Sequence, residues 1–284
     1  MIKPYAEVIG DPIAHSKSPA IHNFWLEKLG AAPTYRAQHV LSDKLGDYIK
    51  SRRSDPEWRG CNITMPHKQA AIDLADRLDP VATQIGAINT LVREGDQLIG
   101  YNTDAVGFLE PLRGELSQEH YFRMARVLGT GGAARAIVAG LAGQGFTIVL
   151  AGRNPDKARS ILEEVAPKGQ HHAVHLDHFA EPTDFAFDDR DGCLDLVVNA
   201  SPLGMRGQSE LAFDWSHAPP GAIAYDIVTD PLDTALLRNA RAAGHQTLDG
   251  LNMLIGQAAT AFEKFFGQAA PREHDAQLRE LLTR

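Results

Sequence analysis

Short apolar runs alternate along the first part of the chain with longer stretches whose apolar residues recur at helical spacing. We expect strands in the short runs and helices in the longer ones. The predicted strands cover residues 6–9, 34–39 and 61–64, and the predicted helices cover residues 19–29 and 43–53. Because Ser18 precedes Pro19, we expect Ser18 to cap the first helix. This β-α-β order predicts a parallel sheet flanked by helices.

A polar turn at residues 94–96 separates two further strand-like runs, at 89–92 and 98–101, and predicts a hairpin. A helical run at 105–112 then leads into the charged stretch 113–120. We place the end of the first domain there, because polar segments without periodicity are typical of connections.

A second β-α series begins near residue 126. Its predicted strands cover residues 147–151, 194–199, 223–226 and 246–248. This order is typical of a dinucleotide-binding fold with a parallel sheet. Residues 169–191 are polar and weakly periodic, so no element is predicted there, and helical patterns follow at 250–266 and 273–282.

Composition places the chain among ordinary globular proteins. Its 284 residues favour two domains, and a net charge of -8 without a lysine-rich run argues against nucleic acid as a partner. No apolar run is long enough to span a membrane, and the first residues lack an apolar signal region, so we expect a cytoplasmic protein. Cys61 and Cys193 stand in apolar strand-like runs, where two buried, reduced thiols are expected.

Three polar clusters stand where predicted strands begin or end. They cover residues 62–68, 86–90 and 100–104. Amides and hydroxyls both donate and accept hydrogen bonds, so this inventory fits a small polyhydroxylated ligand. Lys68 and Asp104 are the candidates for proton transfer, because an ammonium beside a carboxylate can protonate the alkoxide formed when a ketone is reduced.

A glycine turn opens the second series. Gly129-x-Gly131-x-x-Ala134 follows a short strand and precedes a helix, which is the context of a dinucleotide fingerprint. The phosphates are expected on the amino end of that helix, beside Gly132 and Ala133. The next strand is followed by Arg153, Asn154 and Lys157 rather than by an acidic residue, which favours NADP over NAD.

These motifs, taken in order, resemble the shikimate dehydrogenase family, whose members interconvert 3-dehydroshikimate and shikimate with NADP. The resemblance begins at Ser16-Lys17-Ser18-Pro19 and ends at the run from Gly250 to Gln257. It implies an α/β protein with an N-terminal α/β substrate domain (residues 1–112 and 252–284) and a Rossmann-like NADP-binding domain (residues 113–251). The C-terminal helices would return to the first domain.

The resemblance also implies roles for individual residues. It assigns Ser16 and Ser18 to the substrate carboxylate and Asp104 to the ring hydroxyls. Further substrate-binding residues are Asn62, Thr64, Asn89, Tyr225 and Gln257. Further cofactor-binding residues are Asn199, Ser201, Met205 and Gly250.

Two alternatives to this interpretation stay open. One is a quinate/shikimate dehydrogenase with broader substrate or NAD use, and the other is a non-catalytic nucleotide-sensing homologue. A metal site in the histidine-rich segment 170–178 is not expected, because spacing alone seldom defines a ligand set, and a solvent-facing strand edge is the preferred interpretation. We expect a monomer or a homodimer.

Overall fold

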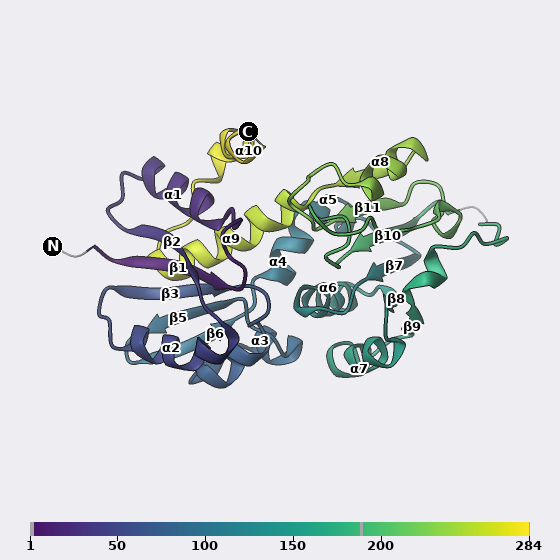
Figure 1. Cartoon of the computed structure of the whole chain (residues 1–284). Coiled ribbons are helices and arrows are strands. Elements are labelled where there is room, and N and C mark those ends of the chain that lie inside the picture. The colour runs from purple at the N-terminus through teal and green to yellow at the C-terminus, as the bar shows by residue number, and fades with distance from the viewer. Residues whose placement is uncertain (1–2, 188–189, 284) are drawn as a thin grey trace. The chain divides into compact units, whose positions relative to one another are not determined.

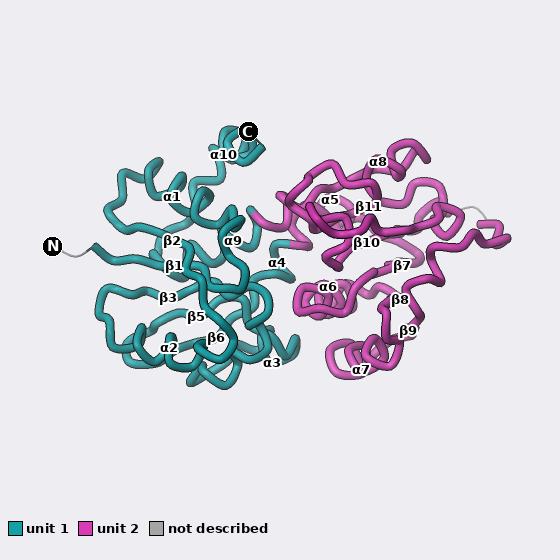
Figure 2. The backbone as a smooth tube through the Cα atoms, viewed as in Figure 1, with its two compact units in different colours: residues 1–107, 255–284 teal, residues 108–254 magenta. Residues whose placement is uncertain are grey.

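The structure is a computed structural model that describes residues 3–187 and 190–283. The chain forms two compact units (Figure 2): unit 1 comprises residues 1–107 and 255–284, and unit 2 comprises residues 108–254. The chain leaves unit 1 within helix α4 (Asp104–Leu109) and returns within helix α9 (Gly250–Phe266).

Unit 1 is built on a six-stranded sheet in the order β2-β1-β3-β5-β6-β4. Its strands are β1 (Tyr5–Gly10), β2 (Thr34–His39), β3 (Trp58–Ile63), β4 (Arg77–Leu78), β5 (Thr90–Glu94) and β6 (Gln97–Tyr101). The parallel pairing predicted from the β-α-β order holds for β2, β1 and β3. The predicted β5–β6 hairpin joins β3 in the antiparallel sense, so the sheet is mixed.

The direction of β5 decides where the polar clusters meet. Asn62 of β3 pairs with Thr90, and Thr90 pairs with Tyr101 of β6. The amino end of β5 therefore lies beside the carboxyl ends of β1, β3 and β6. All three polar clusters predicted from the sequence reach this one edge of the sheet, where ligands of α/β proteins commonly bind.

The helices of unit 1 come from both ends of the chain. They are α1 (Ser18–Lys28), α2 (Leu45–Arg53), α3 (Pro80–Ile85), α9 and α10 (Asp275–Thr283) (Figure 1). Trp25 of α1 packs edge-on against Phe262 of α9, with ring centroids 5.5 Å apart, and both side chains are fully buried. The core of unit 1 thus depends on the returning helix α9.

The predicted cap of α1 is wrong by one residue. The helix begins at Ser18, so Lys17 precedes it and caps nothing with its side chain. The hydroxyl of Ser16 accepts the backbone N–H of Ser18 at 3.3 Å instead. A serine two residues earlier therefore satisfies one N–H that the helix leaves open.

Unit 2 contains a second six-stranded sheet, with every pair parallel, in the order β12-β11-β10-β7-β8-β9. Its strands are β7 (Phe122–Leu128), β8 (Thr147–Gly152), β9 (His172–His175), β10 (Cys193–Asn199), β11 (Ile223–Asp226) and β12 (Gln246–Leu248). Its helices are α5 (Arg113–Leu116), α6 (Gly132–Gly143), α7 (Pro155–Val165) and α8 (Ala235–Ala242). From β9 inward this is the strand order 3-2-1-4-5-6 of dinucleotide-binding domains.

Several short elements were not predicted from the sequence. The segment 169–191 contains the edge strand β9, and residues 188–189 lie outside the described residues. Cys61 is buried as expected, but Cys193 is only half-buried; both are free thiols. Short 3₁₀ helices occur at Ser42–Lys44, Ala70–Leu74, Glu110–Leu112, Leu176–Phe179, Trp215–His217 and Arg272–His274. Among the described residues, no helix combines the length and the apolar character needed to span a bilayer.

Candidate active site

Lys68 and Asp104 form a short ion pair at the polar edge of the unit 1 sheet. Lys68 lies in the turn that follows β3, and its backbone carbonyl accepts a hydrogen bond from Ile88 N at 2.8 Å. Asp104 is the first residue of α4, and its N–H donates to Asn102 Oδ1 at 3.0 Å. The side chains are 14% and 6% exposed, so the pair is largely withdrawn from water while the ammonium keeps some access.

Asn89 fixes the orientation of the Asp104 carboxylate. Its Nδ2 donates to Asp104 Oδ1 at 2.9 Å, while Lys68 binds the other carboxylate oxygen. The Oδ1 of Asn89 accepts the backbone N–H of Thr103 at 2.8 Å. A backbone N–H can only donate and a carboxylate can only accept, so these two contacts allow only one orientation of the amide.

Gln257 brings helix α9 into the same cluster. Its Oε1 accepts from Asn89 Nδ2 at 3.3 Å and lies 3.4 Å from Thr103 Oγ1. The contact joins residues 168 positions apart in the chain. The structure thus brings together four of the predicted site residues, which are Lys68, Asn89, Asp104 and Gln257.

Asn62 lies beside this cluster but is held by the protein itself. Its Oδ1 accepts from the hydroxyl of Tyr35 at 2.6 Å, and its Nδ2 donates to Thr90 Oγ1 at 3.0 Å. Burial raises the pKa of Tyr35 well above its ordinary value, so this hydroxyl remains a donor at neutral pH. The amide of Asn62 therefore already has partners on both sides, which suits a residue that supports the site.

The predicted carboxylate-binding serines lie after β1 on the same side of unit 1. Ser18 is buried, whereas Ser16 is half-buried and accepts the N–H of Ser18. Thr64 follows β3, and its N–H donates to Ile9 O at 3.0 Å, which holds the turn after β3 against the end of β1. These residues are held in place by backbone contacts at the carboxyl ends of β1 and β3.

Tyr225, the remaining predicted substrate residue, belongs to unit 2. It is fully buried near the end of β11 and stacks on Phe108, with ring centroids 4.7 Å apart and planes 13° apart. Its role in substrate binding stays a prediction.

The glycine turn of unit 2 has the geometry that a dinucleotide needs. Gly129 has φ +127°, and a Cβ there would lie 2.6 Å from the carbonyl oxygen of Ala200. Gly131 precedes α6, and a Cβ there would meet no atom within 4 Å. The first glycine is thus required by the tight turn, whereas the second leaves the face of the turn open to a pyrophosphate. Gly132 and Ala133 form the first turn of α6.

The end of β8 carries positive charge and no acidic side chain. Arg153 and Lys157 are exposed, and within residues 3–187 and 190–283 neither forms an ion pair. Asn154 caps α7: its Oδ1 accepts from Asp156 N at 2.9 Å and Lys157 N at 3.3 Å. The two cations are therefore available for an anionic group, and the residues present fit the 2′-phosphate of NADP.

Asn199 supports the loop after β10. It is fully buried, its Nδ2 donates to Asp226 Oδ1 at 3.0 Å, and its Oδ1 accepts from Ser201 N at 3.0 Å. Burial raises the pKa of Asp226 above its ordinary value. Met205 lies further along the loop and is 37% exposed. A Cβ on Gly250 would lie 2.3 Å from the Val228 carbonyl oxygen, so only glycine fits there.

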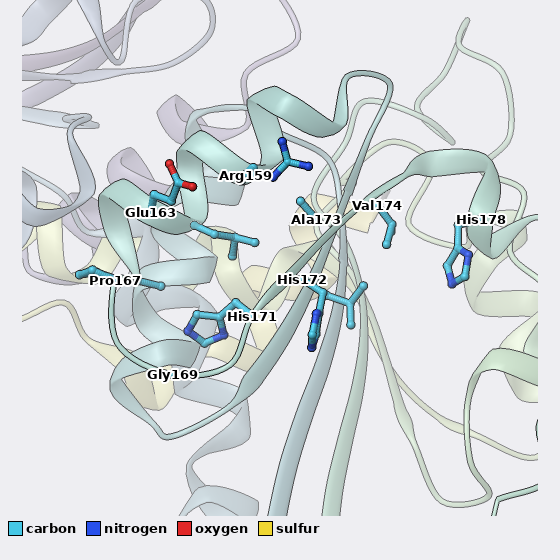
Figure 3. Close-up of a pocket in the computed structure, with 12 residues that line it drawn as sticks. Arg159, Glu163, Pro167, Gly169, His171, His172, Ala173, Val174 and His178 are labelled. Atoms are coloured by element: carbon cyan, nitrogen blue, oxygen red, sulfur yellow. The ribbon is translucent and has the colours of Figure 1, made fainter.

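A pocket of about 710 Å³ lies elsewhere on unit 2, between α7 and β9 (Figure 3). His171, His172 and His178 line it together with Arg159 and Glu163. In the part of the chain that the structure describes, no three histidine, cysteine or acidic side chains are close enough to hold a metal ion. β9 is an edge strand. This agrees with the interpretation of the histidine-rich segment as a solvent-facing strand edge.

Three supporting residues were not identified as site residues from the sequence. Thr90 and Thr103 both contact Asn89. Both stand inside the polar clusters of the sequence, and this position was a signal from which they could have been identified. Tyr35 gave no such signal, because its contact with Asn62 spans 27 positions and arises only when β2, β1 and β3 align.

The sequence of this chain is similar to those of known proteins. Residues 8–91 match the family described as the shikimate dehydrogenase substrate binding domain, and residues 250–277 match the shikimate 5'-dehydrogenase C-terminal domain. The chain is 50% identical over 281 residues to the shikimate dehydrogenase (NADP(+)) of Sphingopyxis alaskensis, covering 98% of this chain and 97% of that protein.

Solved structures of enzymes are also similar to this chain. The shikimate 5-dehydrogenase of Thermus thermophilus in complex with NADP(H) and shikimate is 34% identical, with a TM-score of 0.82 and coverage of 98% of this chain and 99% of that one. The quinate dehydrogenase of Corynebacterium glutamicum in complex with NAD is 29% identical, with a TM-score of 0.81 and 98% of both chains covered. The fold is therefore shared by enzymes that differ in substrate and cofactor.

Proposed function

The chain belongs to the shikimate dehydrogenase family, and we propose that it catalyses the reversible NADP-dependent reduction of 3-dehydroshikimate to shikimate. The family and the cofactor predicted from the sequence motifs are confirmed by 50% identity to an NADP-dependent relative over nearly the whole chain. We assign the substrate to unit 1 and the dinucleotide to unit 2. The corresponding sequence-based boundaries, 1–112 with 252–284 and 113–251, differ from the two units by a few residues.

The Lys68–Asp104 pair is the single observation that best supports catalysis. Reduction of a ketone leaves an alkoxide that needs a proton, and the Lys68 ammonium can donate one and polarise the carbonyl beforehand. In the reverse direction the same nitrogen accepts the hydroxyl proton. Asp104 stabilises the ammonium, and Asn89 holds the carboxylate in the orientation that reaches Lys68.

The remaining residues of unit 1 are assigned to substrate binding. Ser16 and Ser18 offer hydroxyl groups to the substrate carboxylate. Gln257 and Thr64 are assigned to the ring hydroxyls, while Asn62 is assigned mainly to the support of Thr90 and, through it, of Asn89. Hydroxyl and amide groups are suited to both tasks because each can donate and accept.

The cofactor supplies a hydride when it is bound. On this chain, Gly129 and Gly131 form the open turn for the pyrophosphate, and Arg153 and Lys157 provide positive charge for the 2′-phosphate. Asn199 ends β10, Ser201 and Met205 follow it, and Gly250 begins α9 just after β12. We assign these residues to the nicotinamide end of the dinucleotide, because dinucleotides bind at the carboxyl edge of such a sheet. We further propose that the protein acts as a monomer or a homodimer without nucleic acid or membrane partners.

Measured rates with all combinations of two cofactors and two substrates test this proposal. Reduced nicotinamide would be followed by absorbance with NADP or NAD against shikimate or quinate. Fast turnover only with NADP and shikimate is the expected result. Comparable rates with quinate or NAD would favour the broader quinate/shikimate dehydrogenase, and cofactor binding without turnover of either substrate would favour a nucleotide sensor.

A further inference from the structure

The end of strand β8 lacks a side chain. In dinucleotide-binding domains the residue at this strand end contacts the ribose 2′ position, through an acid in NAD enzymes or through a cation-bearing neighbour in NADP enzymes. Here β8 ends at Gly152, and Arg153 follows it. Gly152 has no positive φ, so the backbone itself does not require glycine. The glycine at position 152 therefore has a cause other than its own backbone conformation.

Thr130 occupies the space that a side chain on Gly152 would need. A Cβ on Gly152 would lie 2.6 Å from Thr130 Cγ2 and 3.4 Å from Thr130 Oγ1. Thr130 stands between the two glycines of the cofactor turn, and the neighbouring Gly129 N–H donates to Ala151 O of β8 at 2.8 Å. This bond fixes the turn over the strand end, and a β-branched side chain has few χ1 rotamers with which to move away.

A hydroxyl therefore lies at the ribose end of the site, delivered by the turn instead of by the strand. Thr130 is half-buried, so its side chain is positioned by the protein yet open on one side. Arg153 lies one residue beyond Gly152 and carries a positive charge. A threonine hydroxyl can donate to a phosphate oxygen, which can only accept, and such charge-assisted hydrogen bonds are stronger than neutral ones.

We propose that Thr130 is a specificity-determining residue, whose hydroxyl donates a hydrogen bond to the 2′-phosphate of NADP beside Gly152 and Arg153. The proposal rests on the NADP site of unit 2. It adds a residue from the glycine turn to a subsite that strand-end residues otherwise form. It also explains the glycine at the end of β8, because Thr130 and a side chain at position 152 exclude each other.

Calorimetric titration of the full chain tests the proposal without requiring turnover. The probes are NADP, NAD, adenosine 2′-monophosphate and adenosine 5′-monophosphate. Thr130→Val keeps the shape and removes the hydroxyl, and Thr130→Ser keeps the hydroxyl. We expect Thr130→Val to weaken NADP and the 2′-monophosphate by about 10- to 150-fold, the range for a hydrogen bond to a charged group. NAD and the 5′-monophosphate should bind as they do to the parent, and Thr130→Ser should restore NADP binding.

Equal losses for NADP and NAD in Thr130→Val, or no loss for either, would overturn the role of the hydroxyl. A parent protein that binds NADP no better than NAD would instead count against the proposed cofactor, so the two failures are distinguishable. The shared space is tested separately. Gly152→Ala should displace the Thr130 side chain and so weaken NADP binding, as Thr130→Ala does by removing the hydroxyl. The double variant should lose less binding free energy than the sum of the two single losses. Fully additive losses would show that the two positions do not compete.

Discussion

The Lys68 ammonium and the Asp104 carboxylate are joined by a short ion pair although they lie 36 positions apart, one in a turn after β3 and the other at the start of α4. The antiparallel direction of β5 makes this possible, because it places Asn89 between the two segments. The proposed catalytic pair is thus a product of sheet topology. Its properties can be tested one residue at a time.

Removal of the ammonium should affect turnover far more than binding. If Lys68 stabilises the developing alkoxide, Lys68→Ala should reduce kcat by about 10²- to 10⁴-fold while the dissociation constants of shikimate and NADP stay near those of the parent. Steady-state kinetics combined with calorimetry would measure both quantities. Lys44→Ala, which removes an exposed lysine of the same unit, is the matched control and should leave both unchanged. A defect confined to binding would contradict the assigned role.

Arg153 should select the phosphate of NADP. We expect Arg153→Ala to weaken NADP by about 10- to 150-fold, because a charge-assisted contact contributes about 1.5–3 kcal/mol, and to leave NAD nearly unaffected. Arg159→Ala, on the exposed face of α7 and paired with Asp156, is the control. Dissociation constants for both cofactors would be measured by calorimetry. Equal weakening of NAD and NADP would rule out phosphate selection by Arg153.

The two glycines of the cofactor turn should behave differently. Gly131→Ala meets no neighbouring atom, so the protein should fold with a loss of about 1 kcal/mol or less, yet bind NADP at least about tenfold more weakly because the new methyl group faces the pyrophosphate. Gly129→Ala combines a positive φ with a 2.6 Å approach to Ala200 O, and should lower the free energy of unfolding as well. Denaturant unfolding and NADP titration of both variants would check this. Unimpaired NADP binding by Gly131→Ala would contradict the open-turn assignment.

His22 should make unit 1 sensitive to acid. Complete burial lowers its pKa from 6.5 to about 3, and its ring stacks on Tyr35 with centroids 3.9 Å apart. Between these pH values the unfolded chain binds a proton that the folded chain does not. The free energy of unfolding should therefore be fully retained above about pH 6.5 and fall as pH decreases toward 3, by up to about 1.4 kcal/mol per pH unit.

The variant His22→Phe should reduce this dependence on pH, because phenylalanine keeps the stacked ring and cannot be protonated. Denaturant unfolding at a series of pH values would measure it. His15→Phe is the control, since His15 is exposed and precedes the same helix. If the parent and His22→Phe lose stability in parallel as the pH falls, the buried histidine is not the cause.

Most long elements could be predicted from the sequence, whereas contacts between distant segments could not. The strands β2, β11 and β12 begin and end as predicted, because local apolar patterning and turn residues define them. β4 has two residues and β9 is a half-exposed edge strand, so neither carries a clear pattern. The hydroxyl that accepts an N–H of α1 belongs to Ser16 and not to the predicted Ser18, because both serines have a suitable side chain and only the backbone decides which one is used.

At the site, too, local motifs could be predicted from the sequence, whereas contacts between distant residues could not. Motif positions predicted Lys68, Asn89 and Asp104, because each belongs to a polar cluster within five residues of a strand end. The occupied amide of Asn62 depends on Tyr35, which lies on a different strand. Glu7 is fully buried in β1, where Arg52 and the indole of Trp58 bind its carboxylate, a contact that no local pattern indicates.

The late return of α9 has a consequence for how the protein is made. During synthesis the whole of unit 2 leaves the ribosome before residues 255–266 of α9 do, so the nascent chain can complete the second unit while the first still lacks Phe262 and Gln257. Unit 1 is begun first and finished last. A chain whose synthesis stops just after residue 254 would have all of unit 2 and an incomplete unit 1.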